Sequence, residues 1–315
     1  MKKSVKSLII IGIILAIIGC AILIFGLINS DKNYKMITND YDISEHFTSF
    51  AMDYKTANVE IQPSQNDSVK VTCQEREKVR YNVFVTDGAL TIKVEEDLKW
   101  YEKIFNFGII KDKITVSVPS GDYENLIVTG TTGNVKTAKE IKFNNVEIRL
   151  TTGVVELNSD VKENIKIETT TGNINLNGLT CKRASLSATT GNIILNSLTV
   201  SDELSISATT GNVRLSKINY GSVAIVVTTG NVNLSETFSE GNTQINATTG
   251  NVRFDKADSK EIRVVTTTGN VTGTFQSGKT FYCESNTGIK ILPNSVGGKC
   301  EIKTTTGDII IEIAK

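Results

Sequence analysis

The sequence predicts an all-β protein, a single-stranded parallel β-solenoid (β-helix) of about ten coils preceded by one transmembrane helix. First, a Thr-Gly-Asn turn returns every 19 or 20 residues. Second, apolar and polar residues alternate on both sides of that turn, which is the two-residue period of a strand. Third, a run of 21 uncharged residues stands near the N-terminus. The predicted parts are a cytoplasmic tip and transmembrane helix (1–30), a linker (31–46), divergent N-terminal coils (47–118) and the repeat solenoid (119–315).

The segment from Leu8 to Ile28 carries no charge, and about 20 apolar residues suffice to cross a bilayer as a helix. Lysines at positions 2, 3 and 6 precede it, so we expect a cytoplasmic N-terminus and an extracytoplasmic C-terminal domain at the cell membrane. A cleaved secretory signal would have a shorter apolar core. Residues 17–20 loosely resemble a lipoprotein box ending at Cys20, but the next eight residues stay apolar, which favours an uncleaved anchor.

The repeat is marked by ten glycines, each preceded by a threonine. Glycine suits a turn with positive φ, and asparagine is the residue next best tolerated there. A coil of this length cannot bury a core alone, so stacking at about 4.8 Å would bury one shared apolar column. The turn glycines are Gly133, Gly153, Gly172, Gly191, Gly211, Gly230, Gly250, Gly269, Gly288 and Gly307. Asparagine follows in seven, which we expect to form a hydrogen-bonded ladder: Asn134, Asn173, Asn192, Asn212, Asn231, Asn251 and Asn270.

The strands are predicted from the residues that flank each glycine. The position two after glycine is valine or isoleucine in nine of the ten repeats, and Lys290 is the exception. Ile289 and Ile291 take the apolar phase there, so we expect that rung to be shifted by one residue or bulged. An apolar residue about seven after glycine is expected to fill a third side of the coil, as at Leu179, Leu198, Ile218 and Ala257.

Residues 47–118 alternate like strands but lack the repeat, as expected of terminal coils that cap a solenoid. The segment from Asp97 to Gly108 is expected to be a loop or short helix with four aromatic side chains. These are Trp100, Tyr101, Phe105 and Phe107. They would either cap the open end of the core or contact a partner or the bilayer surface.

Composition excludes several functions. Lysine plus arginine and aspartate plus glutamate both number 34, and a chain without net charge is not expected to bind nucleic acid. With one histidine and five cysteines lacking CxxC spacing, we predict no metal and no cofactor. Cys283 and Cys300 would be diagonal neighbours about 7–8 Å apart on the inward side. Free thiols are therefore expected, with a disulfide as the alternative.

The sequence also resembles a known family. Residues 114–119 (ITVSVP), followed by 126–128 (LIV) and the Thr-Gly-Asn coils, resemble the bacterial putative-adhesin family, over roughly residues 47–315. Members of this family are common in membrane-anchored proteins and near cell-envelope stress genes, including LiaG-type proteins. The resemblance implies the solenoid fold and a context of adhesion or envelope stress. It supplies no catalytic residues to carry over.

An enzyme on a β-helix needs convergent carboxylates on one outer face. The outward columns four before and three after glycine contain no paired carboxylates on neighbouring rungs. Glu147 with Arg149, and Lys166 with Glu168, are interpreted as solvated cross-rung ion pairs. Calcium-binding solenoids use Gly-Gly-x-Gly-x-Asp repeats, whereas this chain supplies asparagine and one glycine per turn.

One predicted surface is unusually small and uncharged. Its candidate docking residues are Ser185, Ser187, Thr189, Ser205, Ser207 and Thr209, with Ala224, Val226 and Thr228 on the next rung. It is either a flat docking surface for glycan, another solenoid or ice, or only a neutral sheet face. The Thr-x-Thr columns of insect ice-binding solenoids are not sustained here.

Three functional hypotheses follow. The first is a non-enzymatic, membrane-anchored surface module that binds an unidentified envelope component or partner protein. The second is a self-associating structural scaffold, because the strand from Asp308 to Ile313 runs nearly to the end of the chain and is expected to leave an exposed edge. The third and least favoured is a glycan-active β-helix enzyme.

Overall fold

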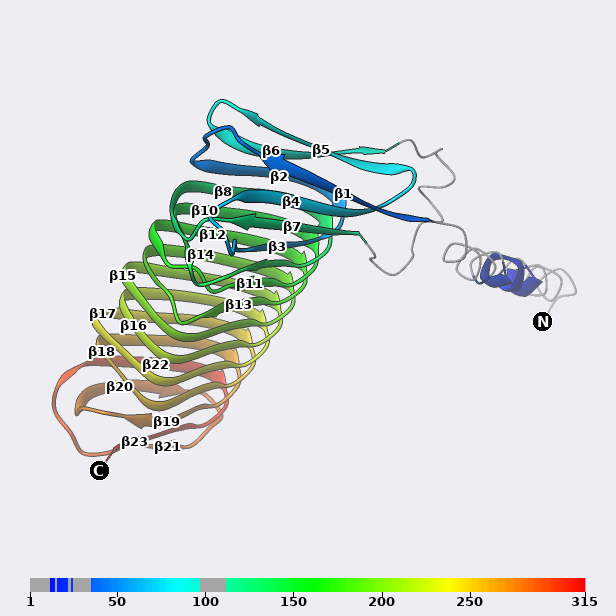
Figure 1. Cartoon of the computed structure of the whole chain (residues 1–315). Helices are drawn as coiled ribbons and strands as arrows, with labels where there is room; N and C mark the ends of the chain where they lie inside the picture. The colour runs from blue at the N-terminus through cyan, green and yellow to red at the C-terminus, as the bar shows by residue number, and fades with distance from the viewer. Residues whose placement is uncertain (1–11, 15, 22–23, 25–34, 97–111, 315) are drawn as a thin grey trace, which may run out of the picture.

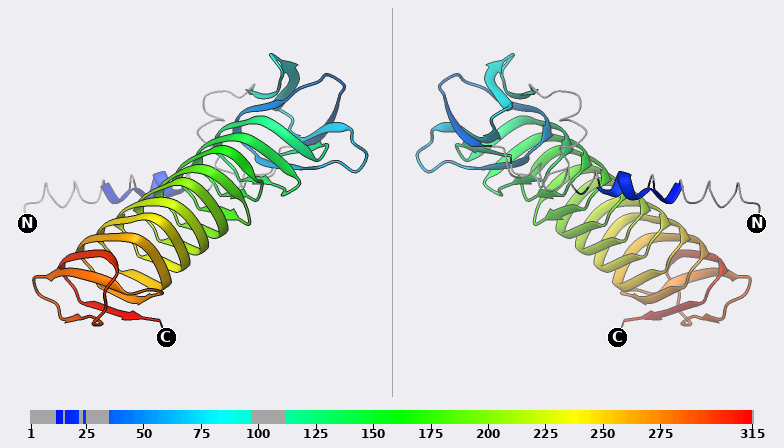
Figure 2. Two further views of the ribbon diagram at one scale, coloured as in Figure 1. Left: turned by 90° about the vertical axis from the view of Figure 1, so that its left-hand side faces the viewer. Right: turned by 90° about the vertical axis from the view of Figure 1, so that its right-hand side faces the viewer.

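The computed structural model describes residues 12–14, 16–21, 24, 35–96 and 112–314. Its strands form one continuous hydrogen-bonded sheet that winds into a rod, with the N-terminal and C-terminal strands at opposite ends (Figure 1). Neighbouring repeat coils pair in parallel and lie evenly side by side along the rod (Figure 2). The predicted all-β parallel solenoid of about ten repeat coils is therefore confirmed.

The strands fall into an N-terminal group and a repeat group. The N-terminal strands are β1 (Met36–Ile43), β2 (Ser49–Thr56), β3 (Asn58–Pro63), β4 (Val69–Arg76), β5 (Val79–Thr86), β6 (Ala89–Glu96) and β7 (Lys113–Val118). The repeat strands are β8 (Gly121–Thr132), β9 (Val135–Thr137), β10 (Ile141–Thr152), β11 (Val155–Leu157), β12 (Val161–Thr171), β13 (Ile174–Asn177), β14 (Thr180–Thr190), β15 (Ile193–Thr210), β16 (Val213–Thr229), β17 (Val232–Thr249), β18 (Val252–Thr268), β19 (Val271–Phe275), β20 (Lys279–Ser285), β21 (Lys290–Ile291), β22 (Gly298–Thr306) and β23 (Ile309–Ile313).

The glycine corners stack backbone against backbone. Gly230 has a φ of 150°, and a Cβ built on it would lie 1.9 Å from the carbonyl oxygen of Gly211 on the preceding rung. Only glycine fits, because any side chain would collide with the neighbouring coil and the positive φ would strain it. Nine of the ten turn glycines have the predicted positive φ, Gly288 being the exception, and close stacking adds a second reason for glycine at these corners.

The predicted asparagine ladder is also present. The side-chain oxygen of each corner asparagine accepts a hydrogen bond from the backbone N–H of the corresponding residue on the next rung. Asn231 N donates to Asn212 Oδ1 over 2.9 Å, and Asn251 N donates to Asn231 Oδ1 over the same distance. The ladder is interrupted at Val154, whose side chain offers no oxygen to the N–H of Asn173.

A second corner lies six residues after five of the turn glycines. Ser197, Lys217, Glu236 and Lys256 all have φ between 51° and 57°, and Gly178 occupies the same position with a φ of 62°. The left-handed conformation is costly for residues with a Cβ. The sequence did not reveal this corner, because its residue types share nothing but an exposed position.

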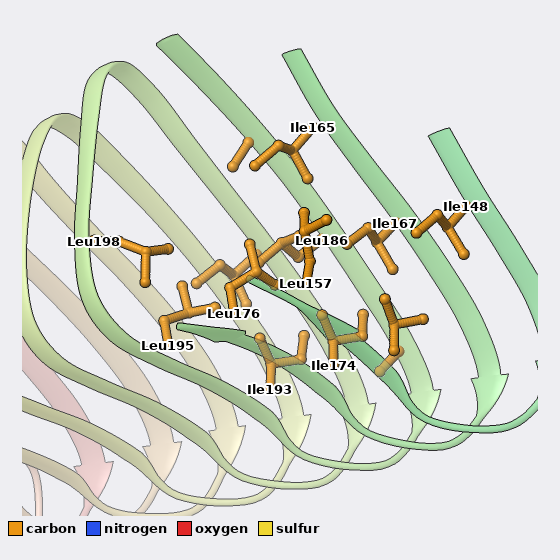
Figure 3. Close-up of a cluster of buried hydrophobic side chains, with 14 of the residues drawn as sticks. Ile148, Leu157, Ile165, Ile167, Ile174, Leu176, Leu186, Ile193, Leu195 and Leu198 are labelled. Atoms are coloured by element: carbon orange, nitrogen blue, oxygen red, sulfur yellow. The ribbon is translucent and has the colours of Figure 1, made fainter. Parts of the chain in front are cut away.

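The core is the apolar column enclosed by the coils (Figure 3). Ile174, Ile193 and Val213 stack in register along one side and are each fully buried. The predicted third-side residues, Leu179, Leu198, Ile218 and Ala257, are buried too. Burial of such side chains contributes about 1.5–3 kcal/mol each relative to exposure.

The N-terminal end is closed by strands stacked out of chain order. β2 and β3 form the first coil, with Ala57 at the corner beneath Gly133. This coil lies between β8/β9 on one side and β6/β7 on the other. Beyond it, β4 pairs antiparallel with β7 and β1, and β5 pairs antiparallel with β6. Part of the segment expected to be a linker is therefore β1, and only part of residues 47–118 forms parallel coils.

The C-terminal end is also out of order. β18 and β19 pair with β22 and β23, and β20 and β21 lie beyond them. The corners follow the same path, because Asp308 N donates to Asn270 Oδ1 and Ile289 N donates to Asp308 Oδ1. The expectation that the strand from Asp308 to Ile313 is the exposed end of the rod is wrong, since β23 pairs with β19 along its length and β21 lies beyond it at Ile309 and Ile310.

The rung at Lys290 is not shifted, so that prediction is wrong as well. Lys290 pairs with the inward-facing Ile309 and keeps the register of the other repeats. Ile289 and Ile291 consequently point outward and are 57% and 53% exposed. The terminal position of this coil leaves the inward lysine accessible to water.

Residues 12–14, 16–21 and 24 are helical, but among the described residues no helix has the length and apolarity needed to cross a membrane. Parts of the predicted span from Leu8 to Ile28 lie outside the described residues, so the transmembrane helix stays a prediction. The proposed contact residues Trp100, Tyr101, Phe105 and Phe107 also lie outside them.

Candidate binding face

The structure brings the predicted docking residues together on the longest side of the coils. Ser185 pairs in register with Ser205 and then Ala224, and Ser187 pairs with Ser207 and then Val226. The next rung continues these two columns with Gln244 and Asn246. The neutral face, as we call it, comprises Ser185, Ser187, Thr189, Ser205, Ser207, Thr209, Ala224, Val226, Thr228, Gln244, Asn246 and Thr248. It extends over four coils without a charged side chain.

Charged residues border the neutral face at both ends. On the N-terminal side, Arg149 Nε lies 3.2 Å from Glu168 Oε2, and Lys166 Nζ lies 3.6 Å from Glu147 Oε1. The predicted pairs of Glu147 with Arg149 and of Lys166 with Glu168 also form, but each lies within one strand, and the cross-rung contacts exchange these partners. They are solvent-exposed, so they contribute little to stability. On the C-terminal side the same columns continue with Arg263.

A shallow hollow of about 380 Å³ lies where the charged border meets the neutral face. Its lining includes Arg149 and Glu168 as well as the hydroxyls of Thr170, Ser187 and Thr189. Long side chains next to short ones on a flat sheet create this depression. It offers hydrogen-bond donors and acceptors but no cluster of titrating groups.

The cysteines do not form a nucleophilic site. Cys73, Cys181, Cys283 and Cys300 are all free thiols, as predicted for the last two. Burial raises the pKa of Cys283 to about 11 and that of Cys181 to about 12. Both remain protonated near neutral pH, and a protonated thiol is a poor nucleophile and metal ligand. Within the described part of the chain, no three His, Cys, Asp or Glu residues are grouped to hold a metal ion.

Two buried ion pairs escaped the sequence reasoning. Near the N-terminal end, Arg76 binds Asp112 through Nε and Nη2, at 3.0 and 2.9 Å. Near the C-terminal end, Lys279 Nζ lies 2.5 Å from Asp258 Oδ1. The members of each pair are far apart in sequence, so no local pattern indicates them. Arg76 and Asp112 lie at the end of the paired strands β4 and β7, whereas Lys279 on β20 reaches past β22 to Asp258 on β18.

The fold and the repeat agree with a known family. The family model described as Toastrack DUF4097 matches residues 47–235 and 201–315. The chain belongs to the Toastrack family. The Toastrack match includes the N-terminal coils together with the repeat, and the predicted resemblance to putative adhesins is confirmed at this level.

Several solved structures are similar to this chain. A putative lipid binding protein from Parabacteroides distasonis has a TM-score of 0.52 and 17% identity, with 90% of this chain and 98% of that chain covered. A putative adhesin from Parabacteroides merdae has a TM-score of 0.46 and 16% identity, with 87% of this chain and 96% of that chain covered. A putative adhesin from Bacteroides fragilis has a TM-score of 0.42 and 14% identity, with 88% of this chain and 97% of that chain covered. At these identities the likeness concerns the fold alone. No curated protein matches the chain.

Proposed function

We propose that this Toastrack protein is a non-enzymatic, membrane-anchored module that binds an envelope component outside the cytoplasm through its neutral face. The observation that carries the proposal is the unbroken run of small, uncharged side chains over four stacked coils. A flat, hydroxyl-lined surface of this kind suits a polar polymer such as wall glycan. A partner protein is the alternative occupant.

The rigidity of the solenoid supports a role in binding. Each strand of the neutral face is fixed by hydrogen bonds to strands on both sides. Serine, threonine and alanine lose little side-chain entropy when a ligand covers them. Binding would therefore cost less ordering than on a loop or on a face of long charged side chains.

The uncharged segment from Leu8 to Ile28 would hold the module at the membrane, and the lysines before it would set its orientation. The rod would then present the neutral face along its length to the surrounding envelope. The alternative of a self-associating scaffold would rest on the last coil and not on β23, because among the described strands β20 pairs only with β22 and β21 only with β23.

The proposal is tested by sedimentation of the full-length protein, kept in detergent, with isolated cell-wall glycan. Ser207→Lys places a long cation in the centre of the neutral face and is expected to weaken retention at least fivefold. Ser197→Lys is the matched control, because lysine already occupies the same corner at Lys217 and Lys256. Equal retention of both variants and the unchanged protein would contradict the proposal. Retention by a purified membrane protein but not by glycan would favour the alternative occupant.

A further inference from the structure

A groove lies around the third bend of the coils, next to the neutral face but not part of it. It has a volume of about 530 Å³ and extends over three coils, lined by residues 199–201, 219–221 and 238–240 and closed at one end by Asp258. Thr199, Asn219, Phe238 and Asp258 follow one another in register along one wall. The groove therefore belongs to the rigid sheet and is not formed by a loop.

Two glycines lie at the bend beside the groove, where the backbones of neighbouring coils touch. A Cβ on Gly221 would lie 2.3 Å from the carbonyl oxygen of Asp202, and one on Gly241 would lie 2.2 Å from that of Gly221. Ser239 secures this bend, because its hydroxyl donates to Gly221 O over 2.7 Å and accepts from Gly241 N over 2.9 Å. The bend is thus held by close backbone packing and by the Ser239 hydroxyl.

One wall carries an aromatic ring among polar neighbours. Phe238 is 39% exposed, although the residues before and after it in the same column are Asn219 and Asp258. A partly exposed ring fixed on a strand offers an apolar surface to a ligand without a large ordering cost. The amide of Asn219 lies beside it and can both donate and accept hydrogen bonds.

The charges of the groove limit its ligand. Glu240 is an exposed residue of the groove lining, while Asp258 is already paired with Lys279. None of the lining residues is a cation. A phosphate, sulfate or uronic acid would therefore meet the Glu240 carboxylate without a compensating cation in the lining. A purely apolar ligand would leave the Asn219 amide and the Glu240 carboxylate unpaired.

We propose that this groove binds a neutral saccharide, with the apolar C–H face of one sugar ring on Phe238 and its hydroxyls on Asn219 and Glu240. A neutral sugar is the ligand class that combines an apolar ring face with many hydrogen-bonding groups and no charge. The site is separate from the neutral face, so each can fail without the other.

Titration calorimetry of the full-length protein in detergent tests the proposal with maltohexaose, cellohexaose and chitohexaose, and with a polygalacturonate oligomer as the acidic probe. We expect at least one neutral oligosaccharide to bind. Phe238→Ala should weaken that binding at least tenfold, and Phe238→Trp should retain it within about threefold. Phe84→Ala is the matched control, because Phe84 is 40% exposed on β5 at the other end of the rod. Ser207→Lys should leave this binding unchanged.

Three results would overturn the proposal. The first is the absence of measurable binding of all three neutral oligosaccharides at millimolar concentration. The second is tighter binding of the acidic oligomer than of any neutral one. The third is an equal loss of affinity in Phe238→Ala and Phe84→Ala, or a full loss in Phe238→Trp with its thermal unfolding unchanged.

Discussion

The ion pair between Lys279 and Asp258 offers a direct test of how the terminal coil is held. Lys279 lies on β20 and Asp258 on β18, although β22 separates these two strands. The lysine passes across β22 at Gly298, its partner in register, where a Cβ would lie 3.7 Å from Nζ. The ammonium group also donates to Ser259 O over 2.7 Å and lies 3.2 Å from Ser277 Oγ. All three of its protons therefore have acceptors within the protein.

We expect Lys279→Met to lower the free energy of unfolding of this end by about 3 kcal/mol. Removing one partner of a buried pair costs about 3–5 kcal/mol, because the remaining charge is left uncompensated. Asp258 retains 20% side-chain exposure, which places the expected loss at the lower end. The double variant Asp258→Asn with Lys279→Met should recover most of the loss, since no buried charge remains.

The assay is hydrogen exchange of peptides covering residues 279–291, because a coil of a solenoid contacts only its neighbours and a local loss appears as fraying. Lys303→Met is the control. Lys303 pairs with Glu284 over 3.4 Å, with side chains 44% and 72% exposed, so its loss should cost less than about 0.5 kcal/mol. The reasoning is refuted if the terminal coil is equally protected from hydrogen exchange in Lys279→Met and in Lys303→Met.

Further predictions concern the corners and the thiols. Val154→Asn should raise the free energy of unfolding by about 1 kcal/mol in urea titrations, because it supplies the missing acceptor for Asn173 N. Gly230→Ala should lower it by about 3 kcal/mol or more, since the new Cβ meets backbone and φ is positive. Lys217→Gly should stabilise by only about 0.5 kcal/mol in the same titration, because relief of about 1–2 kcal/mol of left-handed strain is offset by the greater entropy of an unfolded glycine. Cys283, with its pKa raised to about 11, should react with iodoacetamide at pH 8 far more slowly in the folded than in the urea-unfolded protein.

The repeat was predictable because its requirements are local. A glycine is needed wherever two corners touch, so the ten glycines reveal ten corners directly. The neutral face followed from parity alone, since alternate residues of a strand share one side. The first corner of the chain was not predictable in this way, because Ala57 stands there in place of glycine. Ala57 has a repeat corner, Gly133, on one side only.

Neither the second corner nor the groove could be predicted from the sequence, and the reason differs between the two. Ser197, Lys217 and Glu236 adopt a left-handed conformation only because the stacked coils impose it, so no residue type signals it. The groove lies beside the close-packed bend at Gly221 and Gly241, which break no repeat and look like ordinary strand glycines. Only the three-dimensional register places Phe238 beside them.

The sequence does contain a sign of the exchanged order of the last two coils. It is Lys290 at an inward position, which the sequence analysis interprets as a shift of register. If the coils stacked in chain order, Lys290 would lie between Val271 and Ile309, both of which are fully buried. An unpaired ammonium group in the middle of an apolar column costs several kcal/mol. Exchanging the two coils moves Lys290 to the end of the rod, where water reaches it and its Nζ lies 3.4 Å from Cys283 O. A charged residue at an inward position of one repeat is therefore better interpreted as the mark of a terminal coil than as a shift of register.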